Sequence, residues 1–172
     1  MDPLEIDGRT YSPGEVVTLV GCGKDKREDG RLHYARDLYT STFFLLKSRV
    51  AAGYSAEWYV LSAKHELLHP YQPVGYYDRS LYEFSEEELA EWGSRVGSAL
   101  RVREDMFVDL GVEAVVVLAS EIYLDPLRET LDELPFRVET PLQGVKFHDQ
   151  MRDLSAMSPP ENETLDAFTG DA

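Results

Sequence analysis

Short apolar runs that end at turn residues alternate with longer segments of helical periodicity along this chain. Four such runs occupy residues 16–20, 58–61, 114–118 and 136–139, and the first of them ends at Gly21. β-Branched and aromatic residues dominate the runs, and short runs of this kind are typical of buried strands. The pattern therefore predicts four strands.

Apolar residues at helical spacing predict helices between these strands. Residues 35–52 carry one apolar face and stop at Gly53, as expected of a helix end. Residues 86–110 follow a serine N-cap and begin with three glutamates, which the positive end of a helix dipole favours. We expect a break in this second helix near Gly93 or Gly97.

The remaining segments predict two further helices and two loops. The helices are expected over residues 120–134 and 148–157. Residues 23–34 are polar and contain glycine, and residues 66–78 contain two prolines, so both are expected to be loops.

Strands that alternate with helices indicate an α/β fold with helices on both faces of a parallel sheet. We expect a Rossmann-like three-layer sandwich around a mostly parallel sheet of about four strands. Residues 15–157 are predicted to form a single domain. Residues 1–14 are an N-terminal extension that can hold a short hairpin, and residues 158–172 are predicted to be a disordered acidic tail.

Charge is the strongest signal in the composition. Of the 172 residues, 32 are Asp or Glu and 17 are Lys or Arg, giving a net charge of −15, and the acidic residues are spread along the whole chain. We interpret this as the surface of a protein from a halophilic, archaeal organism. High salt screens repulsion within a few Å, so the net charge does not exclude a nucleic-acid substrate.

The composition also predicts a cytoplasmic protein. No run approaches the roughly 20 apolar residues of a membrane span, and residues 1–15 lack the features of a signal peptide. Cys22 is the only cysteine, which excludes an internal disulfide and a multi-cysteine metal cluster. We expect no membrane partner, no metal and no cofactor.

Polar and reactive residues follow each predicted strand. Ligands of open parallel sheets bind outside the carboxyl ends of the strands. Unrelated loops would seldom place three of the five lysines, the only cysteine and a histidine along one edge. The candidates at this edge are Cys22, Lys24, Lys26, Ser62, Lys64, His65, Glu121 and Gln143.

Cys22 is a candidate nucleophile or ligand contact. It lies between two glycines, and Lys24 and Lys26 are expected to stabilise its thiolate and to bind an anion. The spacing of a P-loop is absent. The structural alternative is a small, buried residue that fills a tight turn.

His65 is a candidate general acid or base, and Lys64 a candidate catalytic cation beside it. The alternative for His65 is a hydrogen-bonded imidazole at a turn. His69 lies four residues after His65, but Pro70 interrupts any helix and the HExxH pattern is absent, which argues against zinc. The nucleophile elbow of hydrolases is also absent.

Further ligand-binding candidates lie on other segments. Asp37, Tyr39 and Ser41 alternate along the start of the first predicted helix, where Asp37 could instead act as a cap. Glu121 and Gln143 have the donors and acceptors needed to recognise the edge of a nucleobase. Residues 76–78 could close over a flat ligand, or could be a packed aromatic loop.

Three motifs resemble a small, largely uncharacterised domain family of bacteria, archaea and phages. Its Cys-Gly-x-Lys turn corresponds to Cys22 and Gly23, with Lys24 one residue earlier than the pattern requires. Its Asp-Leu-Tyr-x-Ser-x-Phe stretch corresponds to residues 37–43. Its Ser-Ala-Lys-His-Gly-Leu-Leu segment corresponds to residues 62–68, with Glu66 in place of the glycine.

The first motif is also remotely similar to the lysine-transferring domain of archaeosine synthase, which attaches lysine to a nitrile-bearing 7-deazaguanine in tRNA. Cys22 and Lys26 match its Cys–Lys spacing, whereas Tyr39 and Ser41 match only after an insertion. The resemblance implies transfer to, or attack on, a modified nucleobase. Addition of the Cys22 thiolate to a nitrile is the implied chemistry.

Three functions are therefore expected as alternatives. The first is an enzyme, in the form of a transferase, that acts on a nucleobase, nucleotide or nucleic acid, in 7-deazaguanine modification. The second is a non-catalytic nucleotide-binding or sensor domain that uses the same edge of the sheet. The third is an interaction subunit of a defence or modification complex, with residues 71–82 as its surface.

Overall fold

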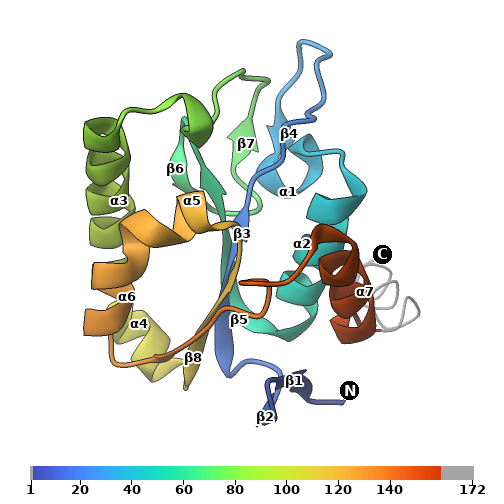
Figure 1. The fold of residues 1–172 in the computed structure, drawn as a ribbon, viewed down its shortest axis with the longest axis vertical. Helices are drawn as coiled ribbons and strands as arrows, with labels where there is room; N and C mark the ends of the chain where they lie inside the picture. The colour runs from blue at the N-terminus through green and yellow to red at the C-terminus, as the bar shows by residue number, and fades with distance from the viewer. Residues whose placement is uncertain (1, 160–172) are drawn as a thin grey trace.

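A five-stranded, mostly parallel sheet runs through the middle of the computed structural model, which describes residues 2–159 (Figure 1). The strand order is β6-β5-β3-β8-β9. The four parallel strands are β3 (Val16–Gly21), β5 (Ser55–Ser62), β8 (Ala114–Leu118) and β9 (Arg137–Glu139). The fifth strand, β6 (Glu66–Leu68), is antiparallel to β5 and forms one edge.

Helices lie on both sides of this sheet (Figure 1). On one side are α3 (Glu86–Arg101), α4 (Glu104–Asp109), α5 (Glu121–Leu124) and α6 (Arg128–Glu133). On the other side are α2 (Thr42–Tyr54) and α7 (Phe147–Met157). The α/β class that the sequence predicts is thus confirmed. No helix within residues 2–159 is long and apolar enough to span a membrane.

The predicted helix over residues 35–52 is divided in two. The short α1 (Ala35–Leu38) ends at Tyr39, whose backbone is extended and forms a β-bridge with Lys26. The Oγ of Ser41 then accepts a hydrogen bond from the Phe44 N–H at 3.1 Å and caps a new helix, α2. This local capping bond explains why the helical pattern is interrupted here.

The predicted helix over residues 86–110 is also divided, but not at its glycines. The break lies between Arg101 and Glu104. Gly93 and Gly97 remain inside α3 because they are contact points for the following segment. A Cβ at Gly93 would clash with Pro126, and one at Gly97 would clash with Thr130. These glycines therefore permit close packing.

The segments expected to be loops contain additional strands. Residues 66–78 hold β6 and β7 (Pro73–Val74), and β7 pairs with β4 (His33–Tyr34). The sheet accordingly has five strands where about four were expected. The predicted helix over residues 120–134 is divided into α5, the 3₁₀ helix η2 (Asp125–Leu127) and α6; a second 3₁₀ helix, η1 (Leu81–Glu83), precedes α3.

The N-terminal extension forms the expected hairpin, from β1 (Leu4–Ile6) and β2 (Arg9–Tyr11). Its Leu4, Ile6 and Tyr11 are buried in the same apolar cluster as Val116 of β8. The hairpin is therefore part of the core. Residues 160–172 of the predicted tail lie outside the described residues.

Candidate functional site

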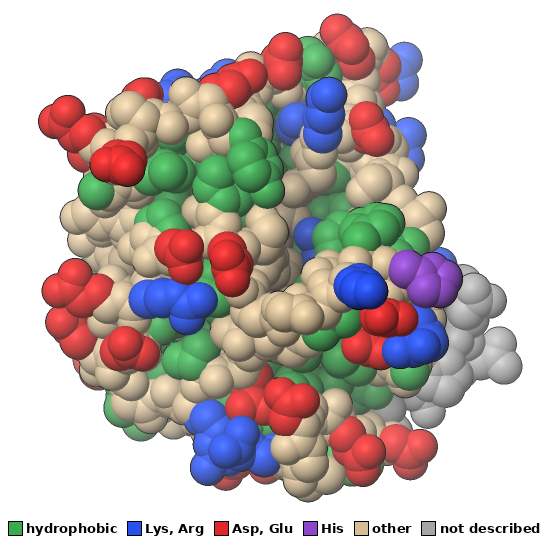
Figure 2. All heavy atoms as spheres, in the orientation of Figure 1, with side chains coloured by type: hydrophobic (Ala, Val, Ile, Leu, Met, Phe, Trp, Pro, Cys, Tyr) green, Lys and Arg blue, Asp and Glu red, His purple; other side chains and the backbone are tan. Residues whose placement is uncertain are grey.

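A crevice lies at the point of the sheet where the chain connections lead away from the central strand toward opposite sides. From the central strand β3, the chain proceeds to β5 on one side and later to β8 on the other. Loops that leave two adjacent parallel strands in opposite directions leave space between them, and ligands bind at such points in α/β proteins. A cavity of about 650 Å³ lies here, and a hollow bordered by hydrophobic side chains is visible in the middle of the face in Figure 2.

The lining of this larger cavity combines charges with aromatic rings. The loop after β3 supplies residues 21–26, and η1 and the residues before it supply residues 78–80, 82 and 83. The cations in the lining are Lys24, Lys26, Lys47 and Arg79, and the carboxylates are Asp25, Asp78 and Glu83. The aromatic residues are Phe43, Tyr82, Tyr123 and Phe147.

Cys22 lies at the carboxyl end of β3 and lines this cavity. Its Sγ is 3.2 Å from the hydroxyl oxygen of Tyr123, and the same hydroxyl can instead donate to the Cys22 carbonyl at 3.4 Å. Burial, and the proximity of Cys22, raise the pKa of Tyr123, so its hydroxyl remains protonated. Tyr123 is therefore a neutral hydroxyl that can donate a hydrogen bond to the sulfur.

Lys47 of α2 lines the same cavity and is absent from the candidates that the sequence predicts. Its side chain is only 4% exposed, and its Nζ donates a hydrogen bond to the Gly21 carbonyl at 2.9 Å. Burial lowers its pKa to about 8, while the charge of Cys22 acts in the opposite direction. Among residues 2–159, no carboxylate lies within 4.0 Å of this amine. The Nζ also lies 4.3 Å from the centre of the Phe43 ring.

The sequence nevertheless contains a signal for Lys47. Phe44, Val50 and Ala51 form the buried stripe of α2, and Lys47 lies on this stripe at three or four residues from each of them. A lysine on the apolar face of a helix is seldom buried without a partner. Helical periodicity alone is therefore enough to mark Lys47 as a candidate.

Tyr39 and Ser62 lie behind the cavity wall. The Tyr39 and Tyr77 hydroxyls are 2.6 Å apart, and the Tyr77 hydroxyl is 2.8 Å from the Ser62 Oγ. Burial raises the pKa of both tyrosines. Lys26 connects this buried network to the cavity, because its Nζ lies 4.5 Å from the centre of the Tyr77 ring. Ser41, the N-cap of α2, lines the cavity directly.

Lys64 and His65 lie on the hairpin turn between β5 and β6. The His65 N–H donates to the Ser62 Oγ at 3.0 Å, and its ring packs edge-on against Tyr77 with centroids 5.3 Å apart. Burial, and then the charge of Lys64, lower the pKa of His65. Lys64 is exposed. Within the described residues, neither side chain belongs to the lining of the larger cavity.

Asp37 and the aromatic loop are placed differently. The Asp37 side chain is exposed, and its backbone carbonyl accepts a hydrogen bond from Arg27 at 2.9 Å. It lies inside α1, so it is not the cap of that helix. Of the loop over residues 76–78, Asp78 lines the larger cavity, Tyr77 is buried and Tyr76 is exposed.

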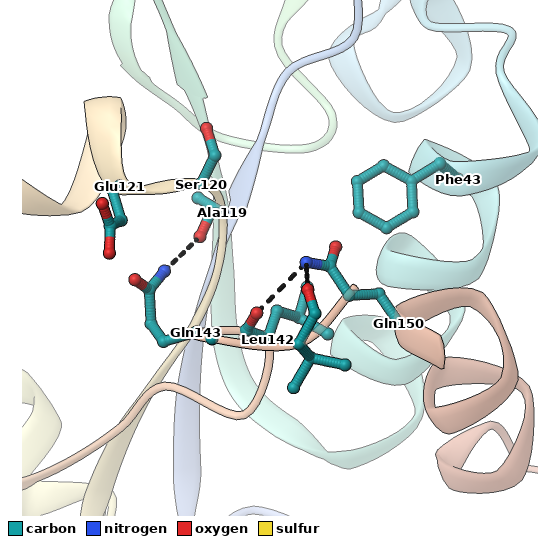
Figure 3. Close-up of a pocket in the computed structure, with 9 residues that line it drawn as sticks. Phe43, Ala119, Ser120, Glu121, Leu142, Gln143 and Gln150 are labelled. Atoms are coloured by element: carbon teal, nitrogen blue, oxygen red, sulfur yellow. Dashed lines mark hydrogen bonds between the residues drawn. The ribbon is translucent and has the colours of Figure 1, made fainter. Parts of the chain in front are cut away.

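Glu121 and Gln143 line a smaller adjoining cavity of about 180 Å³ (Figure 3). Phe43 and Ser120 line both cavities. The Gln143 amide donates to the Ala119 carbonyl at 3.1 Å, and its Oε1 is buried without a partner among residues 2–159. Figure 3 shows Glu121 and Gln143 on the opposite side of the view from Phe43. The two residues predicted to recognise a base thus lie next to the Cys22 cavity, not in it.

The strand order and the cavity define an α/β protein with a cavity of ligand size at the carboxyl edge of its sheet. The chain belongs to the family of unknown function DUF6884, whose model matches residues 17–156. It is also similar to the crystal structure of AF0587, a protein of unknown function, with a TM-score of 0.47 and 17% identity. That match covers 87% of this chain and 47% of the other, so the chain spans about half of its length. No curated protein matches the chain significantly.

Residues 2–159 contain no group of three or more His, Cys, Asp or Glu side chains that could hold a metal ion.

Proposed function

We propose that this protein is an enzyme that acts on a nucleobase or nucleotide, with Cys22 as its nucleophile. The observation that carries this proposal is that the only cysteine of the chain opens onto a cavity of about 650 Å³ at the point where the strand connections diverge. Cavities of roughly 300–1,000 Å³ with a few placed polar groups are typical small-molecule sites. The strand order also supports the Rossmann-like class.

The lining supports a ligand that combines a flat ring with negative charge. Phe43, Tyr82 and Phe147 offer aromatic surface to a base, and Tyr82 is 72% exposed. Four cations and three carboxylates line the cavity, in a chain whose net charge is −15, and acidic side chains are spread over the rest of the face in Figure 2. An excess of cations at the cavity of so acidic a chain favours a ligand with negative charge.

The proposed covalent step is addition of Cys22 to an electrophilic carbon of the base, such as a nitrile. The sulfur forms a bond to the nitrile carbon, one C–N π bond opens, and a proton is taken up by the nitrogen to give a thioimidate. No group leaves in this step. The smaller cavity with Glu121 and Gln143 adjoins the site and supplies polar contacts for an extended ligand.

A second candidate is a non-catalytic nucleotide-binding or sensor domain. The observation in its favour is that Lys64 and His65 do not belong to the lining of the larger cavity within the described residues. A binding domain needs the cations and aromatic rings but no acid or base beside Cys22. The two candidates make opposite predictions for a Cys22→Ser variant.

The test is a thermal-shift screen of nucleobases, nucleotides and 7-cyano-7-deazaguanine, followed by intact-protein mass spectrometry. A ligand that binds the native state raises its unfolding temperature. We expect a protein mass increased by the full mass of the nitrile compound, and no such adduct with Cys22→Ser. Binding without an adduct, retained in Cys22→Ser, would support the sensor domain. Absence of binding in every class would overturn both candidates.

A further inference from the structure

Lys47 is a buried cation with no carboxylate partner in the part of the chain that the structure describes. Among residues 2–159, only the Gly21 carbonyl accepts a hydrogen bond from it, although an ammonium group carries three donors. Burying an unpaired charge is costly, so buried lysines normally have an acidic partner. A negative charge on another group that faces the cavity would therefore stabilise the ammonium form of Lys47.

Cys22 is suited to supply that charge. It directly follows Gly21, whose carbonyl holds the Lys47 amine, and both side chains line the larger cavity. A charge on Cys22 favours the protonated form of Lys47. The Tyr123 hydroxyl, 3.2 Å from the sulfur, can direct its single hydrogen to a thiolate.

The other charged groups of the cavity are less suited to this role. Asp25, Asp78 and Glu83 are exposed and retain their hydration. Lys24 is also exposed, and the Lys26 amine is held over the Tyr77 ring and by the Lys24 carbonyl at 3.1 Å. Arg79 lies over the Phe84 ring. The buried hydroxyls of Tyr39 and Tyr77 are neutral, because burial raises the pKa of each.

We propose that Cys22 and Lys47 form a catalytic pair, in which Lys47 holds the proton of Cys22 and returns it to the substrate. The inference deepens the proposed function and rests on it. In the reacting form of the pair, Cys22 is the thiolate and Lys47 is the ammonium. When the sulfur adds to an electrophilic carbon of a nitrile or carbonyl, negative charge develops on the attached nitrogen or oxygen. The ammonium donates its proton to that atom and becomes a neutral amine, so the charges balance. A Lys47 pKa lowered by burial to about 8 suits this exchange.

The chain's single cysteine allows the pair to be tested without knowledge of the substrate. Alkylation by iodoacetamide reports the thiolate fraction of Cys22 alone, measured by intact mass as a function of pH. A cation at about 4–6 Å lowers the pH of ionisation of an acid by one or more pH units. We therefore expect Lys47→Met to slow alkylation at pH 7 by about tenfold and to move the reactive range to higher pH. Lys146→Met, an exposed lysine outside the lining of both cavities, is the matched control.

High salt distinguishes the effect of Lys47 on Cys22 alkylation from the effect of an exposed lysine. At about 1 M KCl, exposed charges are screened within about 3 Å, whereas buried pairs are screened far less. The effect of Lys47→Met should persist in this salt, and that of Lys24→Met, which removes an exposed lysine of the same cavity, should disappear. An alkylation profile within twofold of wild type in Lys47→Met would overturn the pair.

The proposal of a nucleobase ligand can be tested independently of the proposed Cys22–Lys47 pair. With an unrelated small nitrile as the probe, Lys47→Met should lose adduct formation even if no nucleobase binds. Loss of the adduct in Lys47→Met, without nucleobase binding by wild type, supports the pair and rejects the nucleobase. An alkylation profile unchanged in Lys47→Met, with nucleobase binding intact, rejects the pair and leaves the nucleobase.

Discussion

The loop after β3 and the turn after β5 carry similar residue types in different environments. Both follow parallel strands of the same sheet, and both carry lysine and a group with nucleophilic or acid–base chemistry. The loop after β3 lines a cavity that Cys22 shares with Lys47, whose amine donates to the Gly21 carbonyl. The turn after β5 leads directly into the antiparallel β6. There the His65 backbone N–H donates to the Ser62 Oγ, and the His65 ring packs against the Tyr77 ring.

The difference shows that a place at the carboxyl edge of a parallel strand is not sufficient for a site. A strand followed by a crossover leaves its loop open to the crevice. A strand followed by a hairpin uses its polar residues to hold the turn. We therefore expect mutations in the turn to change stability, and mutations in the loop to change reactivity.

The largest loss of stability in this comparison is expected for Ser62→Ala. Ser62 is fully buried, and its Oγ serves both the Tyr77 hydroxyl and the His65 N–H. Leaving these groups without their partner should cost about 2–3 kcal/mol of unfolding free energy. Urea denaturation measures this. Lys64→Ala, in the same turn but exposed, should remain within about 0.5 kcal/mol of wild type. Equal losses in the two variants would contradict the division between the regions.

The sequence predicts some of the strands around these two regions and misses others. The runs at 16–20 and 114–118 match β3 and β8 closely, because buried parallel strands are continuous apolar runs. Strand β6 is only three residues long and has no polar–apolar alternation, so nothing local distinguishes it from a loop. Because the sequence does not reveal this hairpin, it predicts Lys64 and His65 beside Cys22 at one edge of the sheet.

Some residues of the candidate site could likewise be predicted from the sequence, and others could not. Cys22, Lys24 and Lys26 could be placed at the cavity from the sequence, because they directly follow a legible strand. Lys47 could have been found from its place on the apolar stripe of α2. Tyr123 could not, because its contact with the sulfur depends on how the chain is divided between α5 and η2, and periodicity does not encode that division.

A gain in stability is expected for Lys47→Met. A Lys47 pKa lowered to about 8 corresponds to about 3 kcal/mol of destabilisation at pH 7. Loss of the hydrogen bond to the Gly21 carbonyl offsets about 1 kcal/mol of the gain. The free energy of unfolding of the variant should therefore be about 2 kcal/mol higher than that of wild type at pH 7, while Cys22 alkylation slows.

The pH dependence of this gain has a definite sign. The folded-state pKa of Lys47 lies below its value of 10.5 in the unfolded chain. Between about pH 8 and 10.5 the unfolded state therefore binds more protons, and wild type is stabilised as the pH rises. The advantage of Lys47→Met should disappear across this range in a series of urea titrations. A difference between the two proteins that does not vary with pH would show that Lys47 is not buried as a cation.

The smallest effect is expected at Glu66, where the turn enters β6. Its φ is 65°, in the left-handed region that favours glycine, and its carboxylate pairs with Arg95 at 3.0 Å. Glu66→Gly and Glu66→Ala both remove this exposed ion pair, which contributes at most about 1 kcal/mol. Only glycine also relieves the backbone strain. Glu66→Gly should therefore be more stable than Glu66→Ala by about 1 kcal/mol in urea denaturation, with Cys22 alkylation equal in the two. An alkylation rate that differs between these variants would couple the turn to the cavity and so break the separation of the two regions.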